Sequence, residues 1–426
     1  MQMTKDNRRT FARPDLKKPQ TPADWVGLSF EISALFDGAP VDEEDLFAGR
    51  STEVRKMLES VIARSKHVVL FGEKGVGKTS LTNVFWKRYN QQLRSFIIAR
   101  VQAGPHDTFS SLWGRALEEL HAVGIAVGKA DYVRFQTDQD VWTPSQIRRE
   151  LQKCGANALP VIIVDEYSEV VDEDCKKLTA NLIKEFYDFS VTTTVILVGV
   201  AENISELIAD HASIDRALIE VPLNRMSEAE LREIIQKRAS RTLMTFSNDA
   251  IWTIVILSRG LPYFTQTLSK FAALHAIDNR RLEVTNEDVE ASMSRFIEET
   301  EKAFRESYRA ATRSNQANFF EHSLLACALA KTDDEGFFTA NDVVDPYSAI
   351  MKEKKRIAHF EKHLRRFSSE EGGNILSKRG GDRQQQFRFK DPMMQPYVII
   401  RGIQNKLIPE ADKAILLQRE QGTLPI

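Results

Sequence analysis

The sequence predicts an α/β protein with a parallel sheet domain, followed by an all-α domain and by a small domain of three helices and a β-hairpin. Between residues 46 and 221, short β-branched runs alternate with helical stretches and lack polar alternation, as in strands covered on both faces. From residue 227 to about 291 the apolar spacing is helical. Three further helical stretches then precede two strand candidates separated by Gly380 and Gly381, which is the outline of a winged helix.

In chain order, the strand candidates of the sheet domain are HVVLF (67–71), SFIIARV (95–101), PVIIVD (160–165), TTTVILVGV (192–200) and LIEVPL (218–223). The helical domain opens with SEAELREIIQKRA, in which Ser227 and Glu230 form a capping-box signature. We expect these domains: a flexible basic N-terminal segment over 1–44, the sheet domain over 45–225, a helical lid over 226–300, a linker over 301–316, a winged helix over 317–401 and a tail over 402–426.

Composition favours a folded cytoplasmic protein. The 426 residues are 42% hydrophobic with a formal charge of −2, so any nucleic-acid surface must be local. Cys154, Cys175 and Cys327 lie far apart without CxxC spacing, which argues against a zinc site or a disulfide framework. No apolar run approaches the roughly 18 to 20 residues of a membrane span, and the N-terminus lacks the apolar middle of a signal peptide. We therefore expect no membrane partner.

The segment GEKGVGKT follows the first strand candidate and satisfies the GxxxxGK[ST] pattern of a phosphate-binding loop. Glycines let backbone amides approach an anion, the following helix presents its N-terminus, and a lysine adds charge near the outer phosphates. We expect ATP or ADP to contact this loop and the residue after it. The predicted contacts are Gly72, Glu73, Lys74, Gly75, Val76, Gly77, Lys78, Thr79 and Ser80.

The run PVIIVDE supplies the acidic partner of this loop. Asp165 ends an apolar strand and is placed to hold hydrated Mg²⁺ together with Thr79, while Glu166 is placed to orient or deprotonate the attacking water. The run at 95–101 lies between the two motifs. It predicts an extra strand inserted between the phosphate-loop strand and the acidic strand, as in the additional-strand division of P-loop ATPases.

Together these motifs resemble the AAA+ and STAND ATPases with initiator-like architecture. LFAGRSTE (46–53) resembles the hhGRxxE element, which implies that Gly49 and Arg50 lie near the adenine; a generic surface turn is the other interpretation. SRGLPYFTQTL resembles the lid GxP element, which implies that Pro262 lies near the adenine or ribose. Initiator-type relatives instead carry an arginine on this lid helix, and its absence here, where Tyr263 and Phe264 follow the proline, favours slow hydrolysis.

The resemblance also implies two residues that act on the γ-phosphate. VILVGVAEN resembles the sensor-1 strand, which implies a role for Asn203, with Glu202 as the alternative. HASIDRALIEVPL falls where related ATPases carry an arginine finger, which implies that Arg216 reaches a neighbouring subunit's nucleotide. A surface ion pair is the other interpretation of Arg216.

Residues 351–401 carry thirteen Lys and Arg against six Asp and Glu, a net charge of +7. Helical spacing places Ile357, Phe360, Leu364 and Phe367 toward the core, so a basic face should point outward and contact duplex DNA. That predicted basic face consists of Lys362, Arg365 and Arg366 on the helix and Lys378, Arg379 and Arg383 on the wing. A solvated surface, a partner surface, or the internal clamp that STAND proteins form with this domain are the alternatives.

Two functions follow. One is a nucleotide-dependent switch, in which ATP and ADP favour different domain arrangements and the ATP form assembles with itself or with a separate effector protein. The other is a DNA-handling ATPase of initiator, loader or transposition-helper type, which grips duplex DNA with its winged helix. A nucleotide-bound scaffold without hydrolysis is disfavoured because Asp165 and Glu166 are both present.

Overall fold

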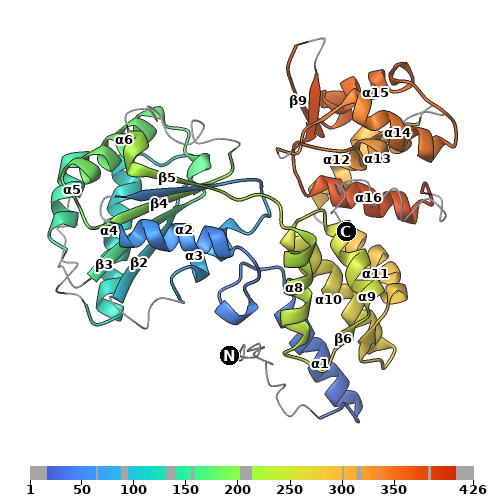
Figure 1. Ribbon diagram of the computed structural model, residues 1–426, viewed down its shortest axis with the longest axis horizontal. Helices are drawn as coiled ribbons and strands as arrows, with labels where there is room; N and C mark the ends of the chain where they lie inside the picture. Colours follow the sequence, from blue (N-terminus) through green and yellow to red (C-terminus); the bar gives the residue numbers. More distant parts are fainter. Residues whose placement is uncertain are drawn as a thin grey trace, which may run out of the picture. The chain divides into compact units, whose positions relative to one another are not determined.

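The computed structural model describes most of the chain, and its contacts divide the chain into two compact units (Figure 1). The sheet unit comprises residues 40–225, and the helical unit comprises residues 1–39 together with 226–426. The described residues are 17–63, 66–87, 95–129, 131, 141–154, 158–201, 214–299, 302–313, 319–333, 335–381 and 385–408.

The sheet unit is built on five parallel strands in the order β2-β3-β4-β1-β5. In β1, which lies between β4 and β5, Val68 is opposite Ile196 of β4 and Ile219 of β5. The strands are β1 (His67–Phe71), β2 (Ser95–Gln102), β3 (Ala158–Asp165), β4 (Thr194–Gly199) and β5 (Leu218–Pro222). The predicted α/β parallel sheet is confirmed.

The position predicted for the extra strand is wrong. Residues 95–102 form β2 at the edge of the sheet, outside β3, and β4 is the strand inserted between β1 and β3. Sequence order misled the prediction, because parallel strands are joined by helical crossovers and need not lie next to each other in chain order.

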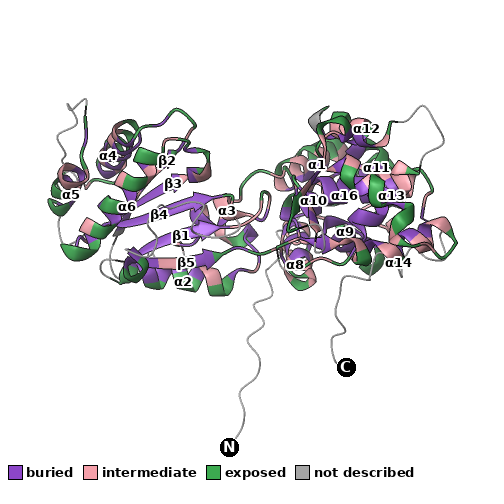
Figure 2. Cartoon of the chain, turned by 90° about the horizontal axis from the view of Figure 1, so that it is seen from above, coloured by how far each residue is buried: buried purple, intermediate pink, exposed green. Residues whose placement is uncertain are grey.

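Helices cover both faces of this sheet (Figure 2). One face carries a single apolar core formed with α4, α5 and α6. On the other face α2 contacts β1 and β5. Strands β1 and β4 are fully buried along their length, which explains their unbroken apolar runs. The helices are α2 (Ser51–Ile62), α3 (Lys78–Val84), α4 (Phe109–Ala126), α5 (Pro144–Gln152) and α6 (Glu173–Asp188), with short 3₁₀ turns at Glu44–Leu46, Tyr167–Glu169 and Asp215–Ala217.

The helical unit begins with an element that the sequence analysis missed. The sequence predicts a flexible segment over residues 1–44, but Pro22–Leu35 form helix α1, which packs against α10. Thr21 caps this helix, Leu28 and Ile32 are buried, and the buried Arg238 donates from Nε to the Leu35 carbonyl at 2.9 Å. The Thr21 cap is local, whereas the bond from Arg238 comes from about 200 positions later in the chain.

The predicted lid is present as a helical layer, and the capping box at Ser227 and Glu230 is confirmed. Helix α10 is the centre of the layer and contacts α1, α8, α9 and α11. A parallel pair of two-residue strands, β6 and β7, lies at its edge. The elements are α8 (Glu228–Ala239), β6 (Thr245–Phe246), α9 (Asn248–Ser258), α10 (Pro262–Asp278), β7 (Glu283–Val284) and α11 (Asn286–Glu299).

The C-terminal domain has the element order expected for a winged helix, with a sheet in the antiparallel order β8-β10-β9. Helix α16 packs on α13 and also on the lid helices α9 and α11. The elements are α12 (Lys302–Thr312), α13 (Phe320–Ala328), β8 (Phe338–Thr339), α14 (Ala340–Met351), α15 (Glu361–Phe367), β9 (Leu376–Arg379), β10 (Gln386–Phe389) and α16 (Met394–Gln404), with 3₁₀ turns at Ile357–His359 and Glu370–Gly372.

Two boundaries in this region need correction. The predicted linker over 301–316 contains α12, which packs on α13 and α16 because Phe304, Tyr308 and Ala311 form a buried stripe at helical spacing. The predicted tail from residue 402 contains the last turn of α16, and residues 409–426 lie outside the described part. Among the described helices, none has the length and apolar character needed to cross a bilayer.

Candidate functional site

The loop after β1 is built from glycines that other residues could not replace without strain. Gly72, Gly75 and Gly77 have φ values of 153°, 85° and 96°. A Cβ atom at Gly72 would lie only 2.3 Å from the carbonyl oxygen of Leu223. Because side-chain bulk is absent at these points, the backbone N–H groups of the loop can approach an anion closely.

Lys78 is held by the loop itself. Its Nζ donates to the carbonyl oxygens of Gly72 at 2.9 Å and Glu73 at 2.7 Å. Burial lowers the pKa of the Lys78 ammonium to about 8, against the opposing effect of the carboxylates of Asp165, Glu73 and Glu166. Burial removes water that would stabilise the charged ammonium, and a bound phosphate would stabilise it instead, so this lysine is suited to an anionic ligand.

Thr79 and Asp165, the two residues predicted to hold metal, lie together. The Thr79 hydroxyl donates to Asp165 Oδ2 at 3.2 Å, across 86 positions of sequence. A hydroxyl and a carboxylate are hard oxygen donors of the kind that Mg²⁺ prefers, so the pair fits this ion with phosphate oxygens and water completing its shell. In the described part of the chain, no cluster of three His, Cys, Asp or Glu residues could hold a metal by itself.

Glu166 sits in a left-handed conformation with φ 54°, which is uncommon for a residue with a Cβ and often marks a functional position. Its N–H donates to Asp165 Oδ1 at 3.0 Å. Its own carboxylate turns toward the end of β2, where Gln102 Nε2 donates to Glu166 Oε2 at 2.7 Å. The two adjacent carboxylates therefore point to different partners.

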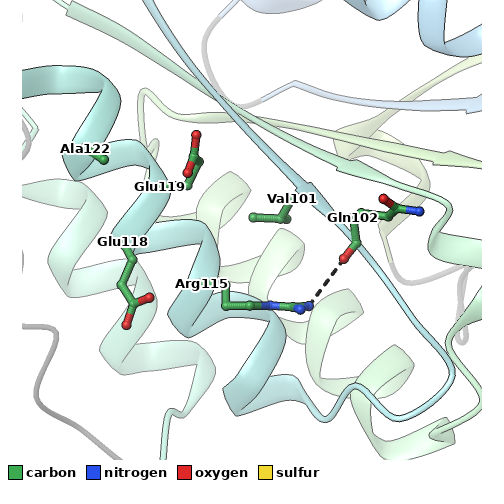
Figure 3. A pocket seen from close by; sticks show the side chains of 6 residues that line it. All are labelled: Val101, Gln102, Arg115, Glu118, Glu119 and Ala122. Carbon is green, nitrogen blue, oxygen red and sulfur yellow. Dashed lines mark hydrogen bonds between the residues drawn. The ribbon is translucent and has the colours of Figure 1, made fainter. Parts of the chain in front are cut away.

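A hollow of about 410 Å³ lies beside Gln102 on the outer side of β2 (Figure 3). Arg115 of α4 borders the hollow and donates to the Gln102 carbonyl at 3.4 Å and to Asp107 Oδ2 at 2.7 Å. Glu118 and Glu119 line it as well. Figure 3 shows that the Gln102 carbonyl faces Arg115, whereas the side-chain amide that bonds Glu166 points away from it.

Arg100 and Gln102, both on β2, are site residues that the sequence did not predict. The Arg100 guanidinium donates to Asn83 Oδ1 at 2.5 Å and to the Thr82 hydroxyl, both on α3, and lies 3.9 Å from Asp165 Oδ2. A signal existed, because the apolar run at 95–102 carries polar residues at positions 100 and 102, which share one face of a strand. That alternation indicated a polar edge to the site.

The GR element contributes a buried cation. Arg50 is 5% exposed, has φ 58°, and donates from Nη2 to the carbonyl oxygens of Val76 at 3.2 Å and Asn224 at 2.6 Å. Glu53 pairs with it at 3.5 Å. Gly49 has φ 62°, which allows the turn before α2. Arg50 therefore joins the phosphate loop to the segment after β5.

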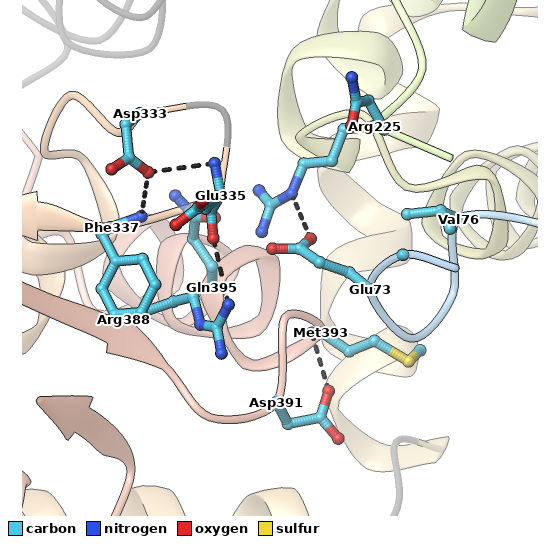
Figure 4. A network of polar contacts seen from close by, with 12 residues as sticks. Glu73, Val76, Arg225, Asp333, Glu335, Phe337, Arg388, Asp391, Met393 and Gln395 are labelled. Carbon is cyan, nitrogen blue, oxygen red and sulfur yellow. Dashed lines mark hydrogen bonds and ion pairs between the residues drawn. The ribbon is translucent and has the colours of Figure 1, made fainter. Parts of the chain in front are cut away.

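The chain leaves the sheet unit twice, between residues 39 and 40 and between residues 225 and 226, and both exits are bonded to the phosphate-loop region. At the first exit, Val41 N–H donates to Ser80 Oγ at 3.0 Å. At the second, Arg225 Nε donates to Glu73 Oε2 at 2.8 Å (Figure 4). Beyond the second exit, Met226 N–H donates to the carbonyl of Gly260, two residues before Pro262.

The remaining predicted catalytic residues are placed as follows. Arg216 is exposed in the turn before β5, and its carbonyl accepts from Lys66 Nζ at the amino end of β1. The phosphate loop lies at the carboxyl end of β1, one strand length away, so Arg216 does not serve this chain's own loop. Asn203 and Glu202 lie outside the described residues. Pro262 is buried at the first turn of α10 in the helical unit.

The basic face is not a uniform set of outward side chains. Lys362, Arg365 and Lys378 are exposed, and Arg365 pairs with Glu361 at 2.6 Å in the next turn. Helix α15 is also shorter than predicted, because the chain forms a 3₁₀ turn at Ile357–His359 before it. Arg383 lies outside the described residues.

Arg366 corrects the prediction that the basic face points outward, whereas Arg379 is exposed as predicted but is paired within its own domain. The Arg366 side chain is 22% exposed, pairs with Glu371, and stacks over Phe320 at 4.9 Å. Arg379 stacks on Phe337 at 3.7 Å and pairs with Asp333 at 3.4 Å and with Glu335. Asp333 in turn accepts backbone N–H bonds from Glu335 at 3.1 Å and Phe337 at 2.8 Å (Figure 4). Arg366 therefore contributes to packing within the domain, and Arg379 forms surface pairs and a ring contact on the wing.

The strand order, the glycine loop and the acidic end of β3 define a P-loop NTPase of the additional-strand class. Residues 39–314 match the family model described as Novel STAND NTPase 1, and the chain belongs to this STAND NTPase family. No curated protein is a significant match for the chain.

Solved structures with a similar fold include a Walker-type ATPase of Pyrococcus abyssi, with 17% identity and a TM-score of 0.51 over 85% of this chain and 99% of that one. The ORC1 protein of Aeropyrum pernix in complex with DNA is also similar, with 14% identity and a TM-score of 0.48 over 90% of this chain and 98% of that one. The RuvB Holliday junction branch migration motor of Thermotoga maritima has 14% identity and a TM-score of 0.43 over 90% and 99%. These likenesses concern the fold.

Proposed function

We propose that the chain binds ATP and ADP with Mg²⁺, hydrolyses ATP slowly, and acts as a nucleotide-dependent molecular switch. The observation that carries this proposal is that both exits from the sheet unit are bonded to the phosphate-loop region, through Ser80 and through Glu73. A ligand that rearranges the loop therefore acts on both connections to the helical unit. Nucleotide shifts the arrangement by its differential affinity for the two states.

The described residues support a hydrolytic cycle. Lys78 would exchange the loop carbonyls for the outer phosphates, and Thr79 and Asp165 would hold the metal, which supplies charge neutralisation. Glu166 would accept a proton from the attacking water. In the structure Gln102 holds the Glu166 carboxylate, which is consistent with slow turnover.

Assembly in the ATP state is part of this proposal. Arg216 is exposed at the end of the sheet opposite its own phosphate loop, so we propose that it completes the nucleotide site of a second copy of the chain. Asn203 remains the proposed contact to the γ-phosphate, Gly49, Arg50 and Pro262 the proposed surroundings of the adenosine, and a separate effector protein the proposed recipient of the signal.

Two measurements test the switch. Light scattering should show a larger assembly with a non-hydrolysable ATP analogue than with ADP, and Arg225→Gln should reduce this difference. The matched control is Arg55→Gln, which removes an exposed, 3.9 Å pair with Glu59 from the same unit. An assembly state that is the same with both nucleotides would sink the proposal.

Glu166→Gln should lower the hydrolysis rate by about 10² to 10³-fold while leaving ADP affinity within about threefold, because the amide cannot accept the proton. Steady-state turnover and ADP titration measure the two effects. Unchanged turnover in this variant would remove Glu166 from the proposed mechanism.

A second candidate function, DNA handling, is favoured by the exposed cations Lys362, Arg365 and Lys378. If it is correct, duplex DNA should stimulate hydrolysis, and Lys362→Glu with Lys378→Glu should abolish the stimulation and lower the salt dependence of binding. A matched double substitution at exposed lysines of α6, Lys177→Glu with Lys184→Glu, controls for net charge. Turnover indifferent to DNA favours the switch alone.

A further inference from the structure

Arg100 occupies an unusual place for a cation. It lies on β2 opposite Ile163, two residues before Asp165 on the neighbouring strand. Its side chain reaches α3, the helix that begins with Lys78 and Thr79, and it lies 3.9 Å from the same Asp165 oxygen that accepts from Thr79. A fixed positive charge therefore lies next to the pair that fits Mg²⁺.

The guanidinium is anchored and cannot easily leave. It donates to Asn83 Oδ1 and the Thr82 hydroxyl, and its side chain is 32% exposed. Burial lowers the pKa of Arg100, and the carboxylates of Asp165 and Asp42 oppose that effect. An arginine remains charged under such conditions. The carboxylates of Glu73, Asp165, Glu166 and Asp42 thus act on two cations, Lys78 and Arg100.

The charge of Arg100 should have opposite effects on nucleotide affinity in the absence and in the presence of metal. Without Mg²⁺, the carboxylates repel a polyphosphate, and the charge of Arg100 offsets part of that repulsion. With Mg²⁺, the same charge repels the ion that Asp165 would hold. A neutral side chain at position 100 should therefore weaken metal-free binding and strengthen the response to Mg²⁺.

We propose that Arg100 is a positioning residue that sets the metal dependence of nucleotide binding by acting as a built-in counter-charge to Asp165. This inference rests on the proposed nucleotide site and adds a role for a residue outside the loop and acidic-strand motifs. It predicts that the wild-type chain retains ADP when Mg²⁺ is removed. The chain could then remain in its ADP arrangement independently of the metal concentration.

The test measures the dissociation constant of ADP for the full chain by calorimetry, once in excess EDTA and once in saturating Mg²⁺. Arg100→Gln should weaken the metal-free affinity about tenfold while the affinity with Mg²⁺ stays equal or increases, so the ratio between the two conditions grows about tenfold or more. Arg55→Gln on α2 is the matched control for loss of one surface charge, and its ratio should not change.

Two variants distinguish the effect of the charge at position 100 from the effect of the hydrogen bonds that anchor the Arg100 side chain to α3. Arg100→Lys keeps the charge and loses the forked hydrogen bonds, and Thr82→Val removes one of the anchoring partners. Both should keep the EDTA to Mg²⁺ ratio within about threefold of the wild-type value. These variants also test the inference if Arg100→Gln does not fold, because a ratio changed tenfold in Arg100→Lys would overturn it.

Failure of this inference and failure of the proposed function would give different results. If Arg100→Gln changes both dissociation constants by the same factor, or neither, Arg100 only anchors β2 to α3 and the inference is overturned while the proposed function stands. If the wild-type chain binds neither ADP nor ATP in either condition, the proposed function fails and this inference fails with it.

Discussion

The arginines of the phosphate-loop region and those of the basic face differ in what surrounds them. Arg100 lies among groups that fit an exchangeable ligand, since its neighbour Asp165 also bonds Thr79 beside the glycine loop. Arg366 and Arg379 are instead paired with the domain's own carboxylates and stacked on its aromatic rings. Net charge alone therefore locates basic residues but does not show which of them can contact a ligand.

The largest expected effect is a loss of ADP affinity on substitution of Lys78, because it tests whether cations of the phosphate-loop region contact a ligand. Lys78→Ala removes the ammonium that the loop carbonyls hold, so ADP affinity should fall about a hundredfold or more. The exposed Lys184 of α6 in the same unit provides the control, and Lys184→Ala should change the affinity less than about threefold. Calorimetric titration with ADP and Mg²⁺ measures both. Equal affinities for Lys78→Ala and wild type would show that the loop is not the nucleotide site.

The next largest effect is a loss of stability in the helical unit on substitution of Asp288, whose two carboxylate oxygens both have partners. Asp288 is buried and accepts hydrogen bonds from Arg281 at 2.7 Å, from Thr285 at 2.9 Å and, at its other oxygen, contacts His275 at 2.7 Å. Asp288→Ala should lower the free energy of unfolding of the lid by about 3 kcal/mol, because it leaves these donors without their acceptor. Hydrogen exchange of α10 and α11 measures the loss. Glu287→Ala, at an exposed neighbour, should leave exchange unchanged.

The same residue predicts a pH dependence. Burial alone would raise the pKa of Asp288, but the hydrogen bonds from Arg281, Thr285 and His275 outweigh it and hold the pKa well below its ordinary value. A carboxyl with a depressed folded-state pKa contributes stability that is present above about pH 4 and is lost as the pH falls below it. Protection of α10 and α11 should therefore decrease below pH 4 in the wild type, and Asp288→Ala should show a smaller decrease. An identical acid profile in the variant would argue against this assignment.

The smallest expected effect is a difference in the free energy of unfolding between substitutions at two adjacent arginines of α15. Arg366→Gln should lower the free energy of unfolding of the C-terminal domain by about 1 to 2 kcal/mol, because the side chain packs over Phe320 and pairs with Glu371. Arg365→Gln should cost about 0.5 kcal/mol or less, since its side chain is 71% exposed and its pair with Glu361 is a surface pair. Hydrogen exchange of α13 and α15 measures both. Equal losses would contradict the distinction between packed and solvated arginines.

Much of the sheet unit could be predicted because its signals are local. The run of residues 68–71, the glycines of the loop and the acidic end of β3 each carry their meaning within a few positions. The same is true of the capping box at Ser227 and Glu230. By contrast, α1 was missed because its stability depends on distant partners such as Arg238, and its own sequence lies next to a basic, proline-containing segment.

The sequence by itself determined the class of loop, the presence of an acidic strand end and the periodicities of the helices, because backbone conformation and capping follow from neighbouring residues. Only the tertiary structure decided that β4 separates β1 from β3, that Arg100 lies beside Asp165, and that Arg379 is paired within its domain. Each of these depends on contacts between residues that are tens of positions apart, where packing and charge pairing rather than local preference select the arrangement.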